Sequence, residues 1–182
     1  MNLDNYKKEL KVLNDMHQTY SLLHIALNRI QTEADASLED ITLRQLMLLL
    51  AIKHLKPQEA TIVNIAGILG TSKQNVTRLV SSMTWSGYLS SKPGQNDKRN
   101  VNISITDAGL TAMNKATGHS NAYFLKLFQD FSREELGTLR NMLEKLVGQN
   151  SDQKYFEEKA NIDIGKDHSE MEQFLNQIRV TL

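Results

Sequence analysis

The sequence of 182 residues contains no cysteine, which excludes disulfides, thiolate metal ligands and any cysteine nucleophile or redox sensor. Nine glycines and two prolines are about half the share found in average proteins, and this scarcity favours a mostly helical chain. The longest apolar stretch, Leu46 to Ile52, falls far short of the roughly 20 residues of a membrane-spanning helix. Since no secretory signal is readable at the N-terminus either, we expect a cytoplasmic protein with no membrane partner.

Net charge is also absent, because 21 Lys and Arg residues balance 21 Asp and Glu residues. The balance is uneven along the chain: residues 1–36 carry a net −1, residues 37–106 carry +4 (8 basic against 4 acidic), and residues 107–182 carry −3 (9 against 12). A basic segment between acidic ones is typical of a domain that binds a polyanion and is supported by the rest of the protein. Charge alone fits an ordinary solvated surface equally well.

The N-terminal segment carries apolar residues at alternating steps of three and four, which predicts one long helix with an apolar seam. The seam consists of Leu13, Met16, Tyr20, Leu23, Leu27 and Ile30. It is too short for a free-standing coiled coil, so we expect it to pack on another part of the protein or on a second chain. A leucine-rich helix is predicted next over 43–55, capped by Thr42 and buried on most sides.

Two short helices joined by a glycine-containing turn are then predicted, one from the cap Thr61 to Gly70 and one from the cap Ser72 to Gly87. This is the signature of a helix-turn-helix. A small residue at Ala66 permits a close helix crossing, and Gly70 tolerates the positive φ of a tight turn. An ordinary helical hairpin is the alternative interpretation.

A two-stranded hairpin is predicted after the second helix, with strands at 88–92 and 101–105 and a polar, basic loop between them. Two strands are marginal alone and must rest on the neighbouring helices, so the hairpin is a wing. Long helices are predicted over 107–129 and 132–148, the latter with a capping box between Ser132 and Glu135.

Residues 149–182 are predicted to form an extension that ends in an amphipathic helix. The apolar stripe of that helix consists of Met171, Phe174, Leu175, Ile178 and Leu182. Packing on the protein's other helices is favoured over exchange with a partner subunit or recruitment of another protein.

The run TIVNIAGILGTSKQNVTRLVSSMTWSGYLSSKPGQNDKRNVNISITDAG resembles the winged helix-turn-helix of MarR-family transcription regulators. ITLRQLMLLLAI resembles the family's preceding helix, and DKRNVNISITDAG resembles its wing tip, second wing strand and next helix start. The resemblance covers roughly residues 10–148 and is specific over 42–109. It implies a mainly α fold with a small β-wing and a homodimer that binds pseudopalindromic DNA, in many members released by a small ligand.

The resemblance divides the chain into four parts: an N-terminal dimerisation helix (1–36), a winged helix-turn-helix DNA-binding domain (37–106), C-terminal dimerisation helices (107–148) and the extension (149–182). Two departures stand out. The resemblance does not include the extension. In addition, Thr84, Trp85 and Ser86 occupy a stretch that is usually more charged in the family.

The second helix of the helix-turn-helix supplies the first candidate DNA-binding residues. Its apolar residues Val76, Leu79 and Val80 are predicted to face the core, so the remaining side chains face outward. Those predicted to reach base edges are Gln74, Asn75 and Arg78, whose side chains suit adenine or guanine. Those predicted to hold backbone phosphates, aided by the helix N-terminus, are Ser72, Lys73 and Thr77. Plain solvent exposure is the alternative for each.

The wing supplies the remaining candidates. Arg99 resembles the family's minor-groove arginine, and a narrow minor groove concentrates the negative potential that a guanidinium favours. Asp97 resembles the acid that orients a neighbouring arginine, whereas Lys92 and Lys98 are predicted to contact phosphates. A solvated hairpin tip is the alternative.

Other classes of function find little support in the sequence. No Gly-rich phosphate loop, nucleophile elbow or metal-binding motif is present, so we expect neither an enzyme nor a cofactor or metal site. The expected partners are double-stranded DNA, a second copy of the chain and a small-molecule effector whose binding residues are unknown. The alternative function is a winged-helix protein-interaction module without DNA readout, but its outward face would be apolar, and here that face is polar and basic.

Overall fold

The structure, a computed structural model, describes residues 3–93 and 101–148. In chain order the elements are α1 (Leu3–Ser37), α2 (Leu43–His54), the 3-10 turn η1 (Pro57–Glu59), α3 (Ile62–Ile68), α4 (Lys73–Trp85), β1 (Leu89–Pro93), β2 (Val101–Ile105), α5 (Asp107–Leu127) and α6 (Arg133–Gly148). The predicted mainly α fold with a small β-wing is confirmed.

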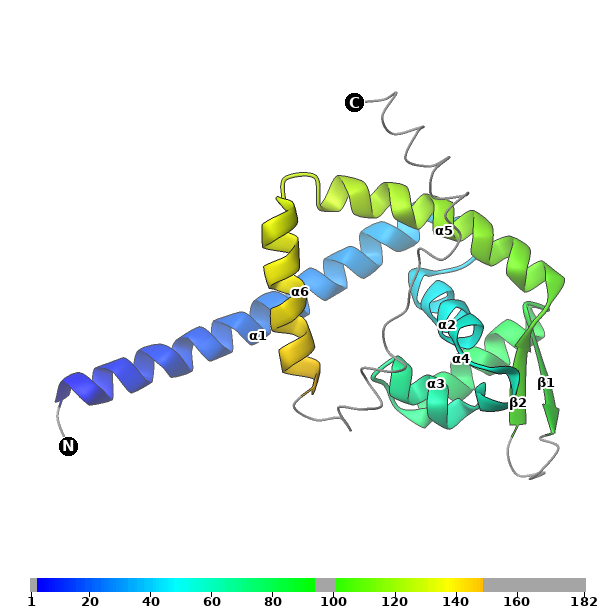
Figure 1. Cartoon of the computed structure of the whole chain (residues 1–182), viewed down its shortest axis with the longest axis horizontal. Coiled ribbons are helices and arrows are strands. Elements are labelled where there is room, and N and C mark those ends of the chain that lie inside the picture. The colour runs from blue at the N-terminus through cyan, green and yellow to red at the C-terminus, as the bar shows by residue number, and fades with distance from the viewer. Residues whose placement is uncertain (1–2, 94–100, 149–182) are drawn as a thin grey trace.

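A compact lobe holds α2, α3, α4 and the two strands (Figure 1). Helix α5 starts at the wing and runs back toward α1, and α6 follows α5 after a short turn (Figure 1). Helix α1 projects from the lobe as one long helix (Figure 1). The lobe with the two strands and the long terminal helices are therefore distinct parts of the described chain.

Side chains cap the helices where the sequence predicts. Thr42 Oγ1 accepts a hydrogen bond from the Gln45 backbone N–H at 3.2 Å, and Gln45 Oε1 accepts one from the Thr42 backbone N–H at 2.8 Å. Ser132 and Glu135 form the predicted capping box at the start of α6, with N–H to oxygen distances of 2.8 and 3.2 Å. These bonds satisfy backbone N–H groups that have no partner inside a helix.

Several element ends differ by one or two residues from the predicted ones. Helix α2 ends at His54, because Leu55 is already extended with ψ 149°. Strand β1 begins one residue later than predicted, since the Tyr88 N–H is used to close α4 on the Met83 carbonyl at 2.9 Å. Helix α5 ends at Leu127 rather than 129.

The core lies between α2 and its neighbours. Leu46, Leu48 and Leu49 are almost completely buried, as the continuous apolar run of α2 predicts. The other large, fully buried side chains come from α3, α4, β2 and α5, and they are Ile65, Val76, Met83, Ile103 and Met113. Strand β2 is attached to the lobe by a hydrogen bond from the Ile103 N–H to the Ala60 carbonyl at 2.9 Å.

Helix α5 is tied to the N-terminal part of the chain by polar contacts. Lys115 Nζ lies 2.6 Å from Glu39 and 3.1 Å from Asp40, and this hydrogen bonding raises the pKa of Lys115 and lowers that of Glu39. Farther along, the Tyr123 hydroxyl donates to Glu33 at 3.3 Å. Burial, followed by the charge of Glu33, raises the pKa of Tyr123.

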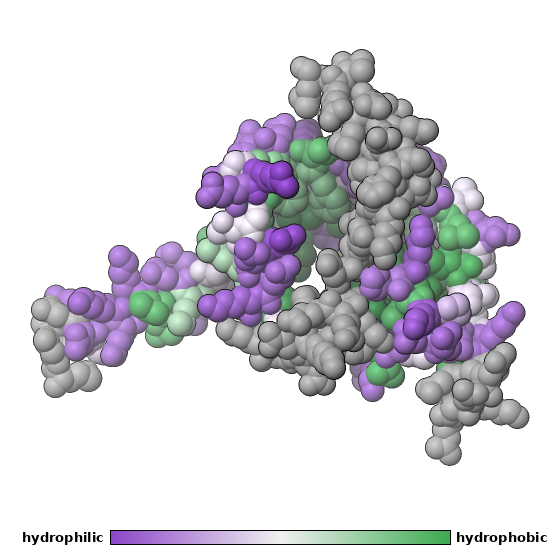
Figure 2. All heavy atoms as spheres, in the orientation of Figure 1, coloured by the Kyte–Doolittle hydropathy of each residue, from purple (hydrophilic) through white to green (hydrophobic). Residues whose placement is uncertain are grey.

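The long terminal helices leave apolar surface uncovered. Every described residue of α1 from 5 to 29 is exposed, and α6 buries none of its residues. All residues of the predicted seam except Ile30 share this exposure: Leu13 is 51%, Tyr20 71% and Leu27 66% exposed, whereas Ile30 is half-buried against the core. Apolar surface is visible on the projecting part of α1 (Figure 2), so the described part of one chain does not cover the seam.

None of the helices within 3–93 and 101–148 is long and apolar enough to cross a membrane.

Candidate nucleic-acid interface

The turn between α3 and α4 has the geometry that the sequence predicts for a helix-turn-helix. Gly70 has a φ of 59°, a conformation that costs other residues free energy because of their Cβ atom. The Thr71 N–H closes the turn on the Ala66 carbonyl at 3.1 Å. Ala66 and Val76 are 5% and 1% exposed, so the predicted small and apolar positions lie inside the angle between the helices.

The start of α4 is open to an anion. Ser72 is the N-cap, and its side chain accepts a hydrogen bond from the Asn75 backbone N–H at 3.2 Å. No acidic residue stands in the first turn. The partial positive charge of the helix N-terminus is therefore not neutralised by a side chain of that turn.

Helix α4 separates an apolar face from a polar one. Val76, Val80 and Met83 are buried and Leu79 is half-buried against the core. All the predicted contact residues of the helix and its cap are exposed, and they are Ser72, Lys73, Gln74, Asn75, Thr77 and Arg78. The structure thus brings these six candidates together on the outer side of one helix.

Two of these side chains already have partners on their own helix or cap. Asn75 Nδ2 donates to Thr71 Oγ1 at 3.2 Å, and the Thr77 hydroxyl donates to the Lys73 carbonyl at 2.8 Å. The side chains of Lys73, Gln74 and Arg78 have no hydrogen-bond partner among the described residues. These three predicted contact residues therefore need break no such bond to reach a ligand.

The wing is an antiparallel pair in which Leu89 faces Ile105 and Lys92 faces Asn102. Leu89 and Ile103 are buried at 2% and 1% exposure, so one face of the hairpin is packed on the helices. Lys92 is exposed near the distal end of β1. The other predicted wing residues, Asp97, Lys98 and Arg99, lie outside the described residues.

The end of α4, the base of the wing and the start of α5 are fixed to one another. Thr106 caps α5, donates its hydroxyl to the Gly87 carbonyl at 2.7 Å and its N–H to the Tyr88 carbonyl at 3.1 Å. Gly109 packs so closely on this junction that an added Cβ would collide with the Tyr88 carbonyl oxygen. The recognition surface is therefore built on a rigid base.

Sequence reasoning assigned no role to Trp85, the last residue of α4, which the structure leaves 91% exposed. The signal was present in the helical spacing, because Trp85 follows Arg78 by seven residues and so falls on the same side of the helix.

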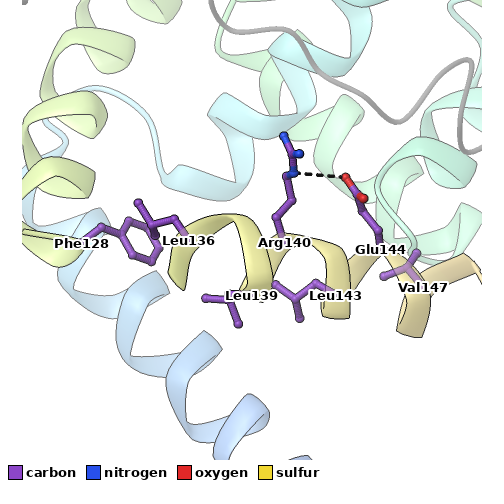
Figure 3. A pocket seen from close by; sticks show the side chains of 7 residues that line it. All are labelled: Phe128, Leu136, Leu139, Arg140, Leu143, Glu144 and Val147. Atoms are coloured by element: carbon purple, nitrogen blue, oxygen red, sulfur yellow. Dashed lines mark ion pairs between the residues drawn. The ribbon is translucent and has the colours of Figure 1, made fainter. Parts of the chain in front are cut away.

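An apolar groove runs along α6, far along the chain from α4 (Figure 3). It has a volume of about 330 Å³ and is lined by Phe128, Leu136, Leu139, Arg140, Leu143, Glu144 and Val147. Arg140 and Glu144 form an exposed ion pair at 3.6 Å. No cluster of three or more His, Asp or Glu residues suited to a metal ion occurs within the part of the chain that the structure describes.

The winged lobe is similar to known proteins. The MarR family model matches residues 39–100. The chain is 24% identical over 132 residues to YpoP, an uncharacterized HTH-type transcriptional regulator of Bacillus subtilis (strain 168), and the match covers 72% of this chain and 92% of YpoP.

Solved structures share the fold over most of the described chain. The organohalide-sensing transcriptional regulator RdhR-CbdbA1625, bound to 2,4-dichlorophenol, superposes with a TM-score of 0.68 and 18% identity, covering 75% of this chain and 84% of that one. A mutant MarR from E. coli complexed with operator DNA superposes with a TM-score of 0.65 and 22% identity, covering 73% and 96%. Residues 39–100 thus match the MarR family model, and the described chain has the winged helix-turn-helix fold of the solved regulators that it resembles.

Proposed function

We propose that this protein is a transcription regulator that binds a pseudopalindromic DNA operator as a homodimer and acts as a repressor. The observation that carries the proposal is the outer face of α4, where Gln74 and Arg78 are exposed and unengaged by other described residues, beside a helix start without acidic residues. The match to a MarR-family complex with operator DNA supports the same function.

The residues divide into two roles. Gln74 and Arg78 read base edges in the major groove, Gln74 at adenine and Arg78 at guanine, and Asn75 joins them once its amide releases Thr71. Ser72 and Lys73 hold phosphates, because the Ser72 oxygen that caps the helix still has a hydroxyl proton to donate. Thr77 also belongs to the phosphate group, after its hydroxyl turns from the Lys73 carbonyl.

The wing extends the contact beyond the major groove. Lys92, exposed on β1, binds a phosphate together with Lys98. Arg99 enters the adjacent minor groove, oriented by Asp97, on the basis of the family resemblance alone.

The dimer is formed by α1, α5 and α6. Its support is the apolar surface that the described part of one chain leaves uncovered: the α1 seam and the groove along α6. An amphipathic helix needs a partner for its apolar stripe, and a second copy presents the same surface to the first. Two α4 helices then fit half-sites one helical turn apart.

A small molecule releases the dimer from DNA. The support is the similar regulator RdhR-CbdbA1625, whose structure contains bound 2,4-dichlorophenol. Such a ligand acts by favouring dimer forms whose recognition helices no longer match the half-site spacing.

Selection of DNA fragments by the purified full-length protein tests the function directly. We expect one enriched pseudopalindrome, and binding that weakens with salt with a slope of log K against log salt on the order of −5 to −7, since about 6–8 phosphates are contacted. Arg78→Ala is expected to relax the preference at one position of each half-site, and to weaken operator binding by about 1–3 kcal/mol for each bidentate arginine–guanine pair that it removes. Enrichment of no common sequence would contradict the proposal.

A further inference from the structure

Trp85 is the most exposed large apolar side chain among the described residues, at 91%, and the chain's single tryptophan. Tryptophan is normally highly buried or sits at an interface. Most of the other exposed large apolar residues belong to α1 and α6, the helices that we propose form the dimer. Trp85 stands at the end of α4 instead, so dimerisation does not account for its exposure.

The position of Trp85 on α4 aligns it with Gln74 and Arg78, two contact residues whose side chains are unengaged. At 3.6 residues per turn, Trp85 lies within roughly 20° of both Gln74 and Arg78 around the helix axis. The buried residues Val76 and Met83 lie on the opposite side. Trp85 therefore continues the stripe that the proposed function directs at DNA.

Distance along the helix decides which part of DNA Trp85 meets. A rise of 1.5 Å per residue places it about 10 Å beyond Arg78 and about 16 Å beyond Gln74. The major groove is about 12 Å wide. When the first two turns of α4 lie over the base edges, the last turn is thus at the groove wall, where deoxyribose and phosphate are exposed.

The backbone that carries Trp85 is held in place. The Gly87 N–H bonds the Thr84 carbonyl at 3.0 Å, and the Tyr88 N–H bonds the Met83 carbonyl at 2.9 Å. The carbonyl of Gly87 in turn accepts the Thr106 hydroxyl at 2.7 Å. An exposed ring on a fixed backbone has little entropy left to lose on binding, apart from its own two side-chain torsions.

We infer that Trp85 is a positioning residue for DNA: its ring packs on a deoxyribose at the edge of the major groove, and its Nε1–H donates to a phosphate oxygen. The inference rests on the proposed function and extends its contact surface by one residue. Because backbone contacts carry no direct sequence information, Trp85 contributes affinity and register. Gln74 and Arg78 contribute the discrimination.

The intrinsic fluorescence of the wild-type, full-length protein tests this without any substitution. Operator DNA obtained by selection is titrated in, binding is followed separately by the anisotropy of labelled DNA, and acrylamide quenching reports access to the single indole. We expect quenching to fall in step with binding. Bound DNA with unchanged quenching overturns the role of Trp85 and leaves the proposed function intact, whereas failure to bind any selected DNA overturns both. Shielding that rises with protein concentration in the absence of DNA assigns Trp85 to a protein contact and overturns the inference.

Three variants separate packing from hydrogen bonding. Trp85→Ala is expected to weaken binding roughly five- to 150-fold for each ring removed, the range known for aromatic rings that stack on nucleic-acid bases. The weakening should be equal for operator and unrelated DNA, with an unchanged salt slope, since tryptophan carries no charge. Trp85→Phe keeps a ring and should weaken binding less. Thr84→Ala is the matched control, exposed at the same helix end but about 100° away around the axis, and should bind like wild type. Equal binding by Trp85→Ala and wild type overturns the inference, as does a weakening confined to the operator, which would make Trp85 a base reader.

Discussion

Replacing Leu27 by alanine tests whether the α1 seam is the dimer interface. Leu27 is 66% exposed, so about two-thirds of its side chain stands to lose water when a second copy covers the seam. The substitution removes three carbons, each worth about 0.8 kcal/mol on full burial, which scales to about 1.6 kcal/mol per protomer. A symmetric dimer contains two copies, so dimerisation should weaken by about 3 kcal/mol, roughly 200-fold in Kd.

Leu22 provides a matched control for this experiment. It is also 66% exposed and lies on the same helix, but its direction differs from the seam by roughly 130° around the axis. Leu22→Ala should leave the dimer Kd within a few-fold of wild type. Sedimentation equilibrium over a wide range of protein concentration measures both constants. Equal weakening in the two variants, or an unchanged Kd in Leu27→Ala, would refute the assignment of the seam.

Two further outcomes concern stability. Gly109→Ala places a Cβ against the Tyr88 carbonyl and should lower the free energy of unfolding by about 1–3 kcal/mol. Gly118→Ala, which has no neighbour within 4 Å, should instead raise it by about 0.5–1 kcal/mol. Urea denaturation measures both changes, and a change of the same sign in the two variants would contradict the close packing at the wing base. The Ser132 N–H and hydroxyl lower the pKa of Glu135 below its usual 4.5. This cap therefore stabilises the fold above pH 4.5, and the stabilisation is lost as pH falls through the lowered pKa. The difference in unfolding free energy between wild type and Glu135→Gln should be constant from about pH 7 to 5 and shrink below 4.5; parallel pH profiles would rule this out.

Caps, turns and buried faces could be predicted from the sequence because each depends on residues close together along the chain. Ser72 and Ser132 act on N–H groups three residues away, and Gly70 is required by its own φ. Contacts between distant residues could not be predicted in this way. The bond from Thr106 to Gly87 spans 19 positions, and that from Lys115 to Asp40 spans 75, so both depend on how the helices pack.

The candidate site shows the same division. Helical periodicity identified which side chains of α4 face outward, and the structure confirms their exposure. Periodicity could not indicate which of them are already bonded. Thr77 and Asn75 have short polar side chains that reach neighbouring groups, a local competition common to these residue types. Trp85 was missed because the predicted contact residues were chosen for charge and hydrogen-bonding groups, whereas tryptophan binds mainly through its surface area.

Helix α5 connects the two halves of the proposed mechanism. Its first residues are bonded to the end of α4 through Thr106 and Gly87, and its last turns are bonded to α1 through Tyr123 and Glu33. Lys115 adds a contact to Glu39 and Asp40, just before α2. Because α5 is held at both ends, a change in how two α1 helices pack must either break one of these bonds or tilt α5 and carry α4 with it. A half-site spacing of about 34 Å tolerates little such displacement, so a ligand that alters the dimer helices can control DNA binding without touching α4.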